Sequence, residues 1–222
     1  MSSIDELRAH LSGLRTLVRG VAGGLSELSA SDDPIRQFEE WYDDAERSGL
    51  LLPESVALAT ATRDGVPSVR MVLLKGVDER GFRFFTNYES RKATELDANP
   101  RAALCFHWSV LERQVRVEGS VERLPREESE EYFETRERGS QIGAWASRQS
   151  RPLDRRADLE TRVRECEVEF LGRPVPLPEF WGGYRLRPDR IEFWQGRRNR
   201  LHDRLVYEPA GSGGWDVTRL YP

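Results

Sequence analysis

The sequence predicts a mainly β protein of the α+β class, an antiparallel barrel with helices at its rim. Short apolar stretches of strand type recur along the chain and are separated by turn residues. Helical spacing of apolar residues occurs near the N-terminus and again between residues 127 and 170. The 222 residues suffice for one domain with a substantial core.

Residues 1–33 are expected to form a helical arm and a flexible connector, and residues 34–222 a single domain. Apolar residues recur at helical spacing in the arm, namely Ile4, Leu7, Leu11, Leu14 and Val18. Glycines and serines are frequent from residue 20 to 33. Asp33 and Pro34 then suit the N-cap and first position of a second helix, which carries an aromatic stripe and ends near Gly49.

The central part of the chain is predicted to be a meander of five strands with one helical excursion. The strands are expected at residues 56–62, 68–74, 82–86, 102–107 and 114–124. A turn at residues 63–65 makes the first two a hairpin. Residues 91–98 fit a short helix between the third and fourth strands.

The last part of the chain is predicted to contain three helices followed by four strands. The helices are expected at residues 127–136, 140–147 and 153–170, the last of them exposed and rich in charge. The strands are expected at residues 183–186, 190–195, 203–208 and 215–220, with a Gly-Ser-Gly-Gly turn before the final one.

Composition excludes several classes of protein. The net charge of −4 and the pI near 5.6 argue against a nucleic-acid-binding chain. No stretch approaches about twenty apolar residues, so neither a membrane span nor a secretory signal is expected. Cys105 and Cys166 lack a Cys-x-x-Cys spacing and are expected as free thiols of a cytoplasmic protein. The three histidines are too scattered for a zinc site, and no metal is expected.

Lysine is nearly absent, with Lys75 and Lys92 against thirty-two arginines. A compact ammonium on a flexible stem suits a phosphate ligand, and both lysines are interpreted in this way. GC-rich coding with two chance survivors is the alternative. Lys92 follows Ser90 and Arg91 at a helix start, where backbone N–H groups and the helix dipole favour an anion. An ordinary serine N-cap with solvated cations explains this segment equally well.

Other polar residues have a less certain placement. Alternate residues of a strand point to opposite faces, so Arg70 and Lys75 reach one ligand only if the strand twists or ends before Lys75. Gln114 in a valine-rich strand is either on the wet face or bonded to a buried group. Gln149 and Ser150 offer an amide and a hydroxyl in a loop.

Two further groups of residues could contact a ligand. The side chains of Tyr132, Arg136 and Ser140 would share one helical face if the helix continued past residue 139, and could grip a phosphate or be exposed surface. The segment from residue 192 to 204 is the most specific local pattern, because a flat Trp194 precedes cations and a histidine. There Arg200, His202 and Arg204 are expected on one side of an extended chain. A structural role is more common than catalysis for such a histidine.

Taken in order, these segments resemble the pyridoxamine 5'-phosphate oxidase family of flavin enzymes. The resemblance extends from Asp33 to Pro222 and is closer than that to split-barrel relatives in phenazine synthesis or haem handling. The matching segments are Asp33-Pro34, Arg70-Met-Val-Leu-Leu-Lys75, Phe85-Thr-Asn87, Ser90-Arg-Lys-Ala93, Leu111-Glu-Arg-Gln-Val115, Ser140-Gln-Ile-Gly-Ala-Trp145, Gln149-Ser150, Pro176-Leu-Pro178, Phe180-Trp-Gly-Gly183, Ile191-Glu-Phe-Trp-Gln-Gly196 and Arg200-Leu-His-Asp-Arg204.

The resemblance implies a Greek-key split β-barrel that forms a homodimer, with FMN at the interface and residues of both chains in each site. It implies that Arg70, Arg91 and Lys92 bind the FMN phosphate, helped by hydroxyls of Thr86 and Ser150. The other implied cofactor contacts are Met71, Val72, Leu73, Leu74, Lys75, Phe85, Gln114, Gln149, Trp194 and Arg204.

The resemblance also implies a substrate site and a reaction. The implied substrate-phosphate ligands are Lys75, Tyr132, Arg136 and Ser140. The implied catalytic pair over the substrate ring is Arg200 and His202, and Leu201 between them is also an implied substrate contact. The reaction is the FMN-dependent oxidation of pyridoxamine and pyridoxine 5'-phosphates to pyridoxal 5'-phosphate in vitamin B6 synthesis. Dioxygen accepts the electrons and yields hydrogen peroxide, and the amine also releases ammonia. The alternative is a carrier of FMN or pyridoxal 5'-phosphate with the same fold and no turnover.

The N-terminal arm departs from the family pattern. Family members often carry an Arg-Arg-x-Tyr segment that closes over the substrate, whereas this chain has Leu14-Arg15-Thr16-Leu17-Val18. Arg15 is expected to remain a substrate contact, but the tyrosine is missing. The preference between amine and alcohol substrates therefore stays open.

Overall fold

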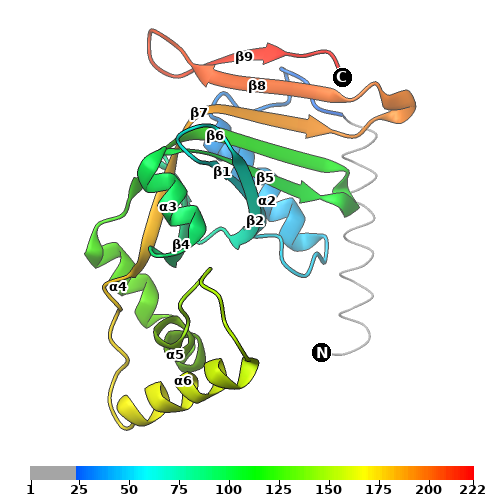
Figure 1. Ribbon diagram of the computed structural model, residues 1–222. Coiled ribbons are helices and arrows are strands. Elements are labelled where there is room, and N and C mark those ends of the chain that lie inside the picture. Colours follow the sequence, from blue (N-terminus) through cyan, green and yellow to red (C-terminus); the bar gives the residue numbers. More distant parts are fainter. Residues whose placement is uncertain (1–23) are drawn as a thin grey trace, which may run out of the picture.

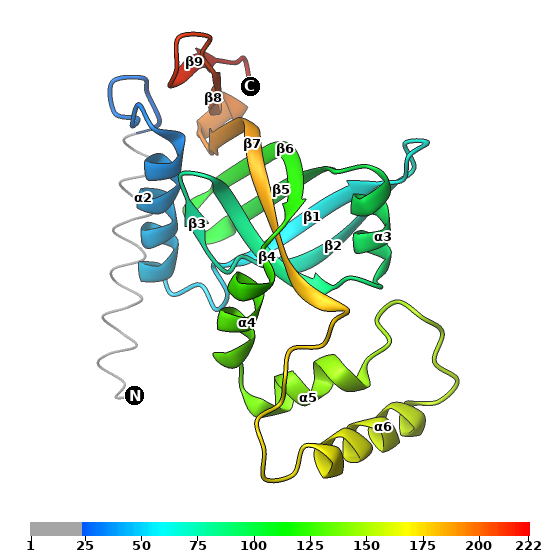
Figure 2. The same cartoon turned by 90° about the vertical axis from the view of Figure 1, so that its left-hand side faces the viewer.

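A computed structural model of the protein describes residues 24–222, and Figure 1 shows their arrangement. Nine antiparallel strands form one curled sheet. Helix α2 covers one side of the barrel, α3 lies on the other, and α4 to α6 lie below it (Figure 2). The elements are α2 (Pro34–Arg47), β1 (Ser55–Ala61), β2 (Pro67–Leu73), β3 (Val77–Asp78), β4 (Gly81–Asn87), α3 (Arg91–Ala98), β5 (Arg101–Trp108), β6 (Arg113–Arg123), α4 (Arg126–Glu134), α5 (Arg138–Ala146), α6 (Arg156–Glu169), β7 (Trp181–Gln195), β8 (Asp203–Pro209) and β9 (Trp215–Arg219).

Helix α2 begins as the sequence predicts. The Asp33 carboxylate accepts a 2.9 Å hydrogen bond from the backbone N–H of Ile35, and Pro34 occupies the first turn. The buried side of the helix carries Phe38 and Trp41. The aromatic stripe is therefore core, as expected.

The strand order corrects the predicted meander. The sheet runs β2-β1-β5-β6-β7-β4-β3, with β8 and β9 added beyond β7. The β1–β2 hairpin is confirmed, but β4 pairs with β7 along the register from Phe82↔Leu186 to Asn87↔Trp181. Helix α3 carries the chain across the barrel, so the next strand, β5, joins the free edge of β1.

Strand β7 is one strand of 15 residues where two were expected. Pro188 lies at the point where the β6 register shifts between Glu118 and Gly119, so its missing N–H falls in an irregularity of the ladder. A Cβ on Gly119 would lie 1.9 Å from the carbonyl oxygen of Arg187. Glycine is therefore required for this close approach.

The barrel is split, as the resemblance implied. The strand ladder has β2 and β3 at the ends of its main path. A short bridge joins β2 to β4 just past the end of β2, where Lys75 N donates to Arg83 O and Arg83 N donates to Gly76 O, both at 2.8 Å. The split-barrel class is thus confirmed.

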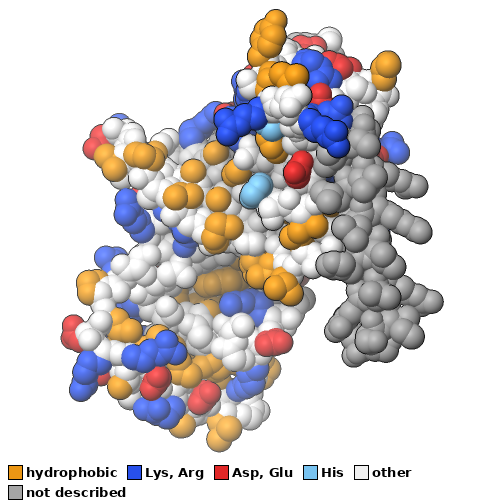
Figure 3. Space-filling model, turned by 90° about the vertical axis from the view of Figure 1, so that its right-hand side faces the viewer, with side chains coloured by type: hydrophobic (Ala, Val, Ile, Leu, Met, Phe, Trp, Pro, Cys, Tyr) orange, Lys and Arg blue, Asp and Glu red, His pale blue; other side chains and the backbone are white. Residues whose placement is uncertain are grey.

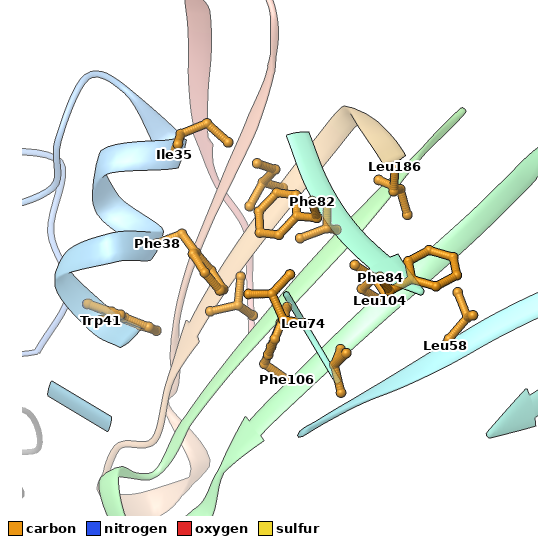
Figure 4. Close-up of a cluster of buried hydrophobic side chains, with 14 of the residues drawn as sticks. Ile35, Phe38, Trp41, Leu58, Leu74, Phe82, Phe84, Leu104, Phe106 and Leu186 are labelled. Carbon is orange, nitrogen blue, oxygen red and sulfur yellow. The ribbon is translucent and has the colours of Figure 1, made fainter. Parts of the chain in front are cut away.

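An aromatic cluster joins α2 to the barrel (Figure 4). The ring of Phe38 lies 4.9 Å from those of Phe82 and Phe106 and 5.9 Å from that of Trp108. All four side chains are buried. Each large core side chain of this kind contributes about 3 to 5 kcal/mol when compared with alanine.

A second cluster lies under the barrel, where α4 to α6 pack against the start of β7. It contains Phe133, Ile142, Phe170 and Trp181. Helix α4 ends at Glu134 and α5 starts at Arg138, so the two separate helices expected at residues 127–136 and 140–147 are confirmed, and the condition of one helix continuing past residue 139 is not met. Helix α6 has no buried residue, as its charge pattern predicted.

Two expectations about the whole chain can be compared with the described part. Cys105 and Cys166 are free thiols, and both are half-buried. None of the helices between residues 24 and 222 has the length and apolarity needed to cross a membrane. Residues 24–33 form turns and bends, with Leu25 in the core, and the division of the chain at residue 33 stays a prediction.

Candidate active site

A cavity of about 300 Å³ opens between β2, β4, α3 and α4. Its lining contains four cationic side chains and no carboxylate among the residues that the structure describes. The lining residues are Arg70, Met71, Val72, Leu73, Lys75, Phe85, Thr86, Lys92, Tyr132, Arg136, Gln149 and Trp181. The excess of positive charge makes this cavity a candidate site for an anionic ligand.

Lys92 is buried on the inner side of α3, with uncharged hydrogen-bond partners. Its ammonium donates to the hydroxyl of Thr86 at 3.0 Å, to Gln149 Oε1 at 2.8 Å and to the hydroxyl of Ser90 at 3.3 Å. Burial, and then the charge of Arg70, lowers the pKa of Lys92 to about 8. Ser90 precedes the helix, but its hydroxyl does not cap it. Because Lys92 is buried, the alternative of a serine N-cap with solvated cations is wrong for this residue.

Arg70 is held from several sides on the same wall of the cavity. Its Nη1 donates to the Thr60 hydroxyl at 2.6 Å and to the carbonyl of Leu58 at 3.1 Å. Its Nη2 lies 3.4 Å from the carboxylate of Glu95, which is only 4% exposed. These contacts fix the direction of the Arg70 guanidinium.

Glu95 links Arg70 to Arg91. The Nε of Arg91 donates to Glu95 Oε1 at 2.8 Å, and the rest of the Arg91 side chain is 61% exposed. Burial alone would raise the pKa of Glu95, but hydrogen bonds from Ser68, Thr60 and Arg91 lower it to about 2. Glu95 was missed from the sequence, although its spacing of four residues from Arg91 on one helix was a usable signal.

Aromatic rings line the other wall. The rings of Phe85 and Tyr132 stack with centroids 4.0 Å apart, and Trp181 stacks on Phe85 at 5.6 Å. The Arg136 guanidinium lies 4.7 Å from the centre of the Trp181 ring. Trp181 was not singled out as a site residue, although it belongs to a segment that matched the family.

Arg136 has donor capacity to spare. Its Nη1 is buried and has no hydrogen-bond partner. Burial lowers the pKa of Arg136, because the charged form loses hydration without a carboxylate in contact. An anion in the cavity would satisfy this nitrogen.

The end of β2 resolves the question of alternation. The strand ends at Leu73, so Lys75 lies beyond it and reaches the same cavity as Arg70. Met71, on the outer face, is 62% exposed. Leu74 is buried in the core and does not line the cavity, and the cofactor contact implied for it stays a prediction.

A second cavity of about 270 Å³ adjoins the first and shares Arg136, Gln149 and Trp181 with it. Ser140 lines this second cavity. The break between α4 and α5 thus still leaves Tyr132, Arg136 and Ser140 around connected space. Ser150, by contrast, is exposed and lines neither cavity.

The remaining predicted residues lie together at the other end of β7. Gln114 pairs with Trp194, and Trp194 pairs with Arg204 across the β6, β7 and β8 ladder. The ring of His202 lies 4.4 Å from that of Trp194. Arg204 forms two hydrogen bonds with the carboxylate of Glu192, at 2.8 and 3.1 Å. None of these residues lines either cavity.

The loop before β8 differs from the extended chain that was expected. Residues Arg198–Arg200 form a 3-10 turn, and both Asn199 and Arg200 have left-handed backbone angles. Arg200 and Leu201 are exposed. Arg15 lies outside the described residues.

The structure therefore separates the predicted residues into a cationic cavity and an aromatic group near the β7–β8 loop. An open-edged antiparallel barrel with an anion site of this kind defines the class of split-barrel ligand-binding proteins. Comparison with known proteins identifies the family. Residues 42–169 match the family described as pyridoxamine 5'-phosphate oxidase, and residues 181–222 match the pyridoxine 5'-phosphate oxidase C-terminal dimerisation region.

Relatives agree with this assignment. The pyridoxine/pyridoxamine 5'-phosphate oxidase of Rubrobacter xylanophilus is 60% identical over 97% of this chain and 98% of its own. That of Psychromonas ingrahamii is 53% identical over the full length of both. The chain belongs to the pyridoxamine 5'-phosphate oxidase family and is a flavin-dependent oxidoreductase of that family.

Solved structures agree with the fold. PhzG from Burkholderia lata 383, in complex with tetrahydrophenazine-1-carboxylic acid, has a TM-score of 0.83 and 33% identity, covering 87% of this chain and 95% of its own. A pyridoxamine 5'-phosphate oxidase-related, FMN-binding protein from Nostoc punctiforme PCC 73102 has a TM-score of 0.69 at 17% identity, covering 85% and 98%. The second likeness concerns the fold alone.

Proposed function

We propose that this protein uses FMN to oxidise pyridoxamine 5'-phosphate and pyridoxine 5'-phosphate to pyridoxal 5'-phosphate, with dioxygen as the electron acceptor. Hydrogen peroxide is the second product, and the amine substrate also consumes one water molecule, which hydrolyses the imine, and yields ammonia. The observation that carries the proposal is the buried ammonium of Lys92, which has uncharged hydrogen-bond partners in a cavity lined by four cations.

The FMN phosphate fits the α3 side of the cavity. Lys92 and Arg70 supply charge there, Thr86 supplies a hydroxyl, and Arg91 lies at the first turn of the helix. A phosphate dianion would offset the cost of burying the Lys92 ammonium. When bound, FMN supplies the ability to accept a hydride, which side chains lack.

The substrate phosphate fits the α4 side. Lys75, Tyr132 and Arg136 line the same cavity, and Ser140 lines the adjoining one. The unpartnered Nη1 of Arg136 supports an anion at this place. Anchoring the phosphate far from the reacting carbon turns binding energy into orientation of the ring.

Each site needs residues from two chains. Trp181 lines the cavity, whereas Trp194 lies thirteen residues further along the same strand, a path of up to about 43 Å along the strand at ~3.3 Å per residue. Trp181 and Trp194 therefore lie near opposite ends of this long strand, which Figure 2 shows running from above α4 to the top of the barrel. Gln114, Trp194 and Arg204 therefore act on the cofactor held by the partner subunit.

The outer face of β2 suits contact with that partner. Val69, Met71 and Leu73 are exposed side chains on one face of this strand. Figure 3 shows hydrophobic side chains spread over one face of the barrel. The match to a dimerisation region at residues 181–222 supports the same assembly.

Within the assembled site, Arg200 and His202 would hold the substrate ring. Both lie on the β7–β8 loop, and the ring of His202 lies beside the flat ring of Trp194. Their role is to keep the reacting carbon close to the cofactor and to exclude water, so that the hydride has one destination.

Anaerobic flavin bleaching tests the proposal. The purified protein with FMN is expected to lose its oxidised flavin absorbance when pyridoxine 5'-phosphate is added without oxygen. Peroxide released under air then separates an oxidase from a carrier. Because PhzG was solved with tetrahydrophenazine-1-carboxylic acid, that compound is added to the protein in a parallel bleaching experiment. Bleaching by it alone would assign the chain to phenazine chemistry.

Arg200→Leu should slow turnover with FMN retained. Arg187→Leu is the matched control, since Arg187 is an exposed strand arginine paired with Glu122. Full activity of Arg200→Leu would remove Arg200 from the catalytic pair.

A further inference from the structure

Asp203 gathers three separate parts of the chain at one carboxylate. Its Oδ2 accepts the backbone N–H of Leu25 at 3.0 Å and lies 3.4 Å from Nε of Arg197. Its Oδ1 accepts a 3.0 Å hydrogen bond from Arg219 on β9. Asp203 is also the first residue of β8, so it closes the loop that carries Arg200 and His202.

Arg197 contacts both Asp203, through its side chain, and His202, through its backbone. The backbone N–H of Arg197 donates a 3.1 Å hydrogen bond to Nδ1 of His202. A backbone N–H can only donate, so Nδ1 must be the unprotonated nitrogen. The proton of the neutral ring is then on Nε2, which becomes a hydrogen-bond donor.

The loop between Arg197 and His202 has a strained backbone. Asn199 and Arg200 have φ angles of 60° and 61°, a region that residues with a side chain rarely adopt. Such a conformation persists only when its surroundings hold it. Gly24 adds to the restraint, because a Cβ at this residue would lie 2.8 Å from Asp203 Oδ2 and 3.0 Å from Arg197.

We propose that Asp203 is a positioning residue. It holds Arg197 so that the Arg197 amide keeps His202 with Nδ1 as acceptor and Nε2–H as donor. Resting on the proposed function, His202 would donate a hydrogen bond to an acceptor atom of the substrate ring and would not remove a proton from it. This gives the histidine an orienting role and leaves the redox chemistry to the cofactor.

The competing explanation is that Asp203 only straps the N-terminal segment to the barrel. A substitution of Arg219 distinguishes the positioning role from the strap, because Arg219 bonds Asp203, Glu27 and the carbonyl of Leu25. Changing Arg219 weakens the strap but leaves the contact between Asp203 and Arg197. Figure 1 shows β8 and β9 together at the top of the molecule, where this strap lies.

Nitrogen NMR of the histidine rings reads the tautomer directly. The FMN-loaded protein, labelled with ¹⁵N-histidine, has three rings, and His202→Gln identifies the signal that belongs to His202. We expect an unprotonated shift at Nδ1 and a protonated shift at Nε2. A proton on Nδ1, or on both nitrogens at neutral pH, would overturn the proposal without reference to turnover.

Variants then test the role of Asp203. In Asp203→Asn we expect a mixture of tautomers and a fall in kcat of roughly tenfold, the scale for losing an orienting partner, with the FMN dissociation constant unchanged. Arg219→Met and Asp189→Asn, an exposed strand carboxylate paired with Arg101, should keep the wild-type tautomer. An equal change in Arg219→Met would assign the effect to the strap and overturn the positioning role.

A second variant guards against misfolding. Arg197→Met keeps the amide but removes the guanidinium that meets Asp203, so a partial loss of the tautomer is expected. An unchanged His202 tautomer in both Asp203→Asn and Arg197→Met would overturn the positioning role of Asp203. If His202 has the expected tautomer but pyridoxine 5'-phosphate fails to bleach the flavin, the proposed function fails and the ring geometry stands.

Discussion

The phenol ring of Tyr132 stacks on the ring of Phe85, with centroids 4.0 Å and planes 22° apart. This contact joins α4 to β4 and brings the Tyr132 hydroxyl to the wall of the cationic cavity. Burial raises the pKa of Tyr132, so the hydroxyl keeps its proton and can donate to a phosphate at any physiological pH.

Two substitutions separate the ring from the hydroxyl. Tyr132→Phe keeps the stack and loses one hydrogen bond, so we expect KM for pyridoxine 5'-phosphate to rise about three- to tenfold, or ~0.5 to 1.5 kcal/mol. Tyr132→Ala also removes the stack and should raise KM further. Steady-state kinetics with FMN in excess provides the measurement. Equal KM in Tyr132→Phe and wild type would exclude the hydroxyl from the phosphate site.

Lys92→Met should weaken FMN binding while leaving the apoprotein no less stable. The lost phosphate contact is expected to cost about 1.5 to 3 kcal/mol, or roughly ten- to a hundredfold in the dissociation constant. The apoprotein loses a buried charge that has no carboxylate in contact, so its stability should not fall. Flavin fluorescence titration gives the first quantity and urea unfolding the second. Unchanged FMN affinity would contradict the assignment.

The same lysine predicts a pH dependence. The pKa of Lys92 is about 8 in the folded protein and 10.5 in its ordinary range, so the unfolded chain binds more protons between these pH values. The stability of the apoprotein should therefore gain from this group as pH rises from 8 toward 10.5. Urea unfolding of wild type and Lys92→Met at several pH values isolates the effect. A constant difference between the two across this range would show that the pKa is not depressed.

Met71→Asp should disrupt the dimer and the site together. Met71 is exposed on the outer face of β2 yet lies beside the cavity, so a charge there opposes association of two chains. Sedimentation should show monomer, and FMN retention should fall with it. Val168→Asp, on the exposed helix α6, is the matched control. A Met71→Asp dimer that retains FMN would place the interface elsewhere.

Phe106→Ala should destabilise the fold by about 3 to 5 kcal/mol, because the ring is fully buried between α2 and the barrel. Leu28→Ala, at a fully exposed side chain, should change stability by less than about 0.5 kcal/mol. Chemical denaturation compares the two. A small effect at Phe106 would mean that the aromatic cluster repacks around the lost ring.

Local patterns predicted the elements well, and long-range pairings poorly. Helix α3 lies at residues 91–98 as expected, since helical apolar spacing acts over one or two turns, although the Ser90 hydroxyl does not cap the helix. The pairing of β4 with β7 joins residues about a hundred positions apart and leaves no local sign. Two strands were expected in place of β7, but the register shift at Gly119 accommodates Pro188 within one strand.

The site shows the same division. Lys75 and Lys92 were singled out by composition, and the structure brings both to one cavity. Periodicity could not show that β2 ends before Lys75, because strand ends depend on the bridge to Arg83. The roles given to Arg200 and His202 stay predictions, since one chain keeps them away from that cavity.

Strand β7 has a genetic consequence. The two ends of β7 serve different sites in the proposed dimer. A substitution at Lys92 therefore damages the cavity of its own chain, whereas a substitution at Arg200 damages the site of the partner. When such chains pair, both lesions gather in one centre and the other is assembled from undamaged parts. Two inactive alleles expressed together should therefore restore growth that neither supports alone.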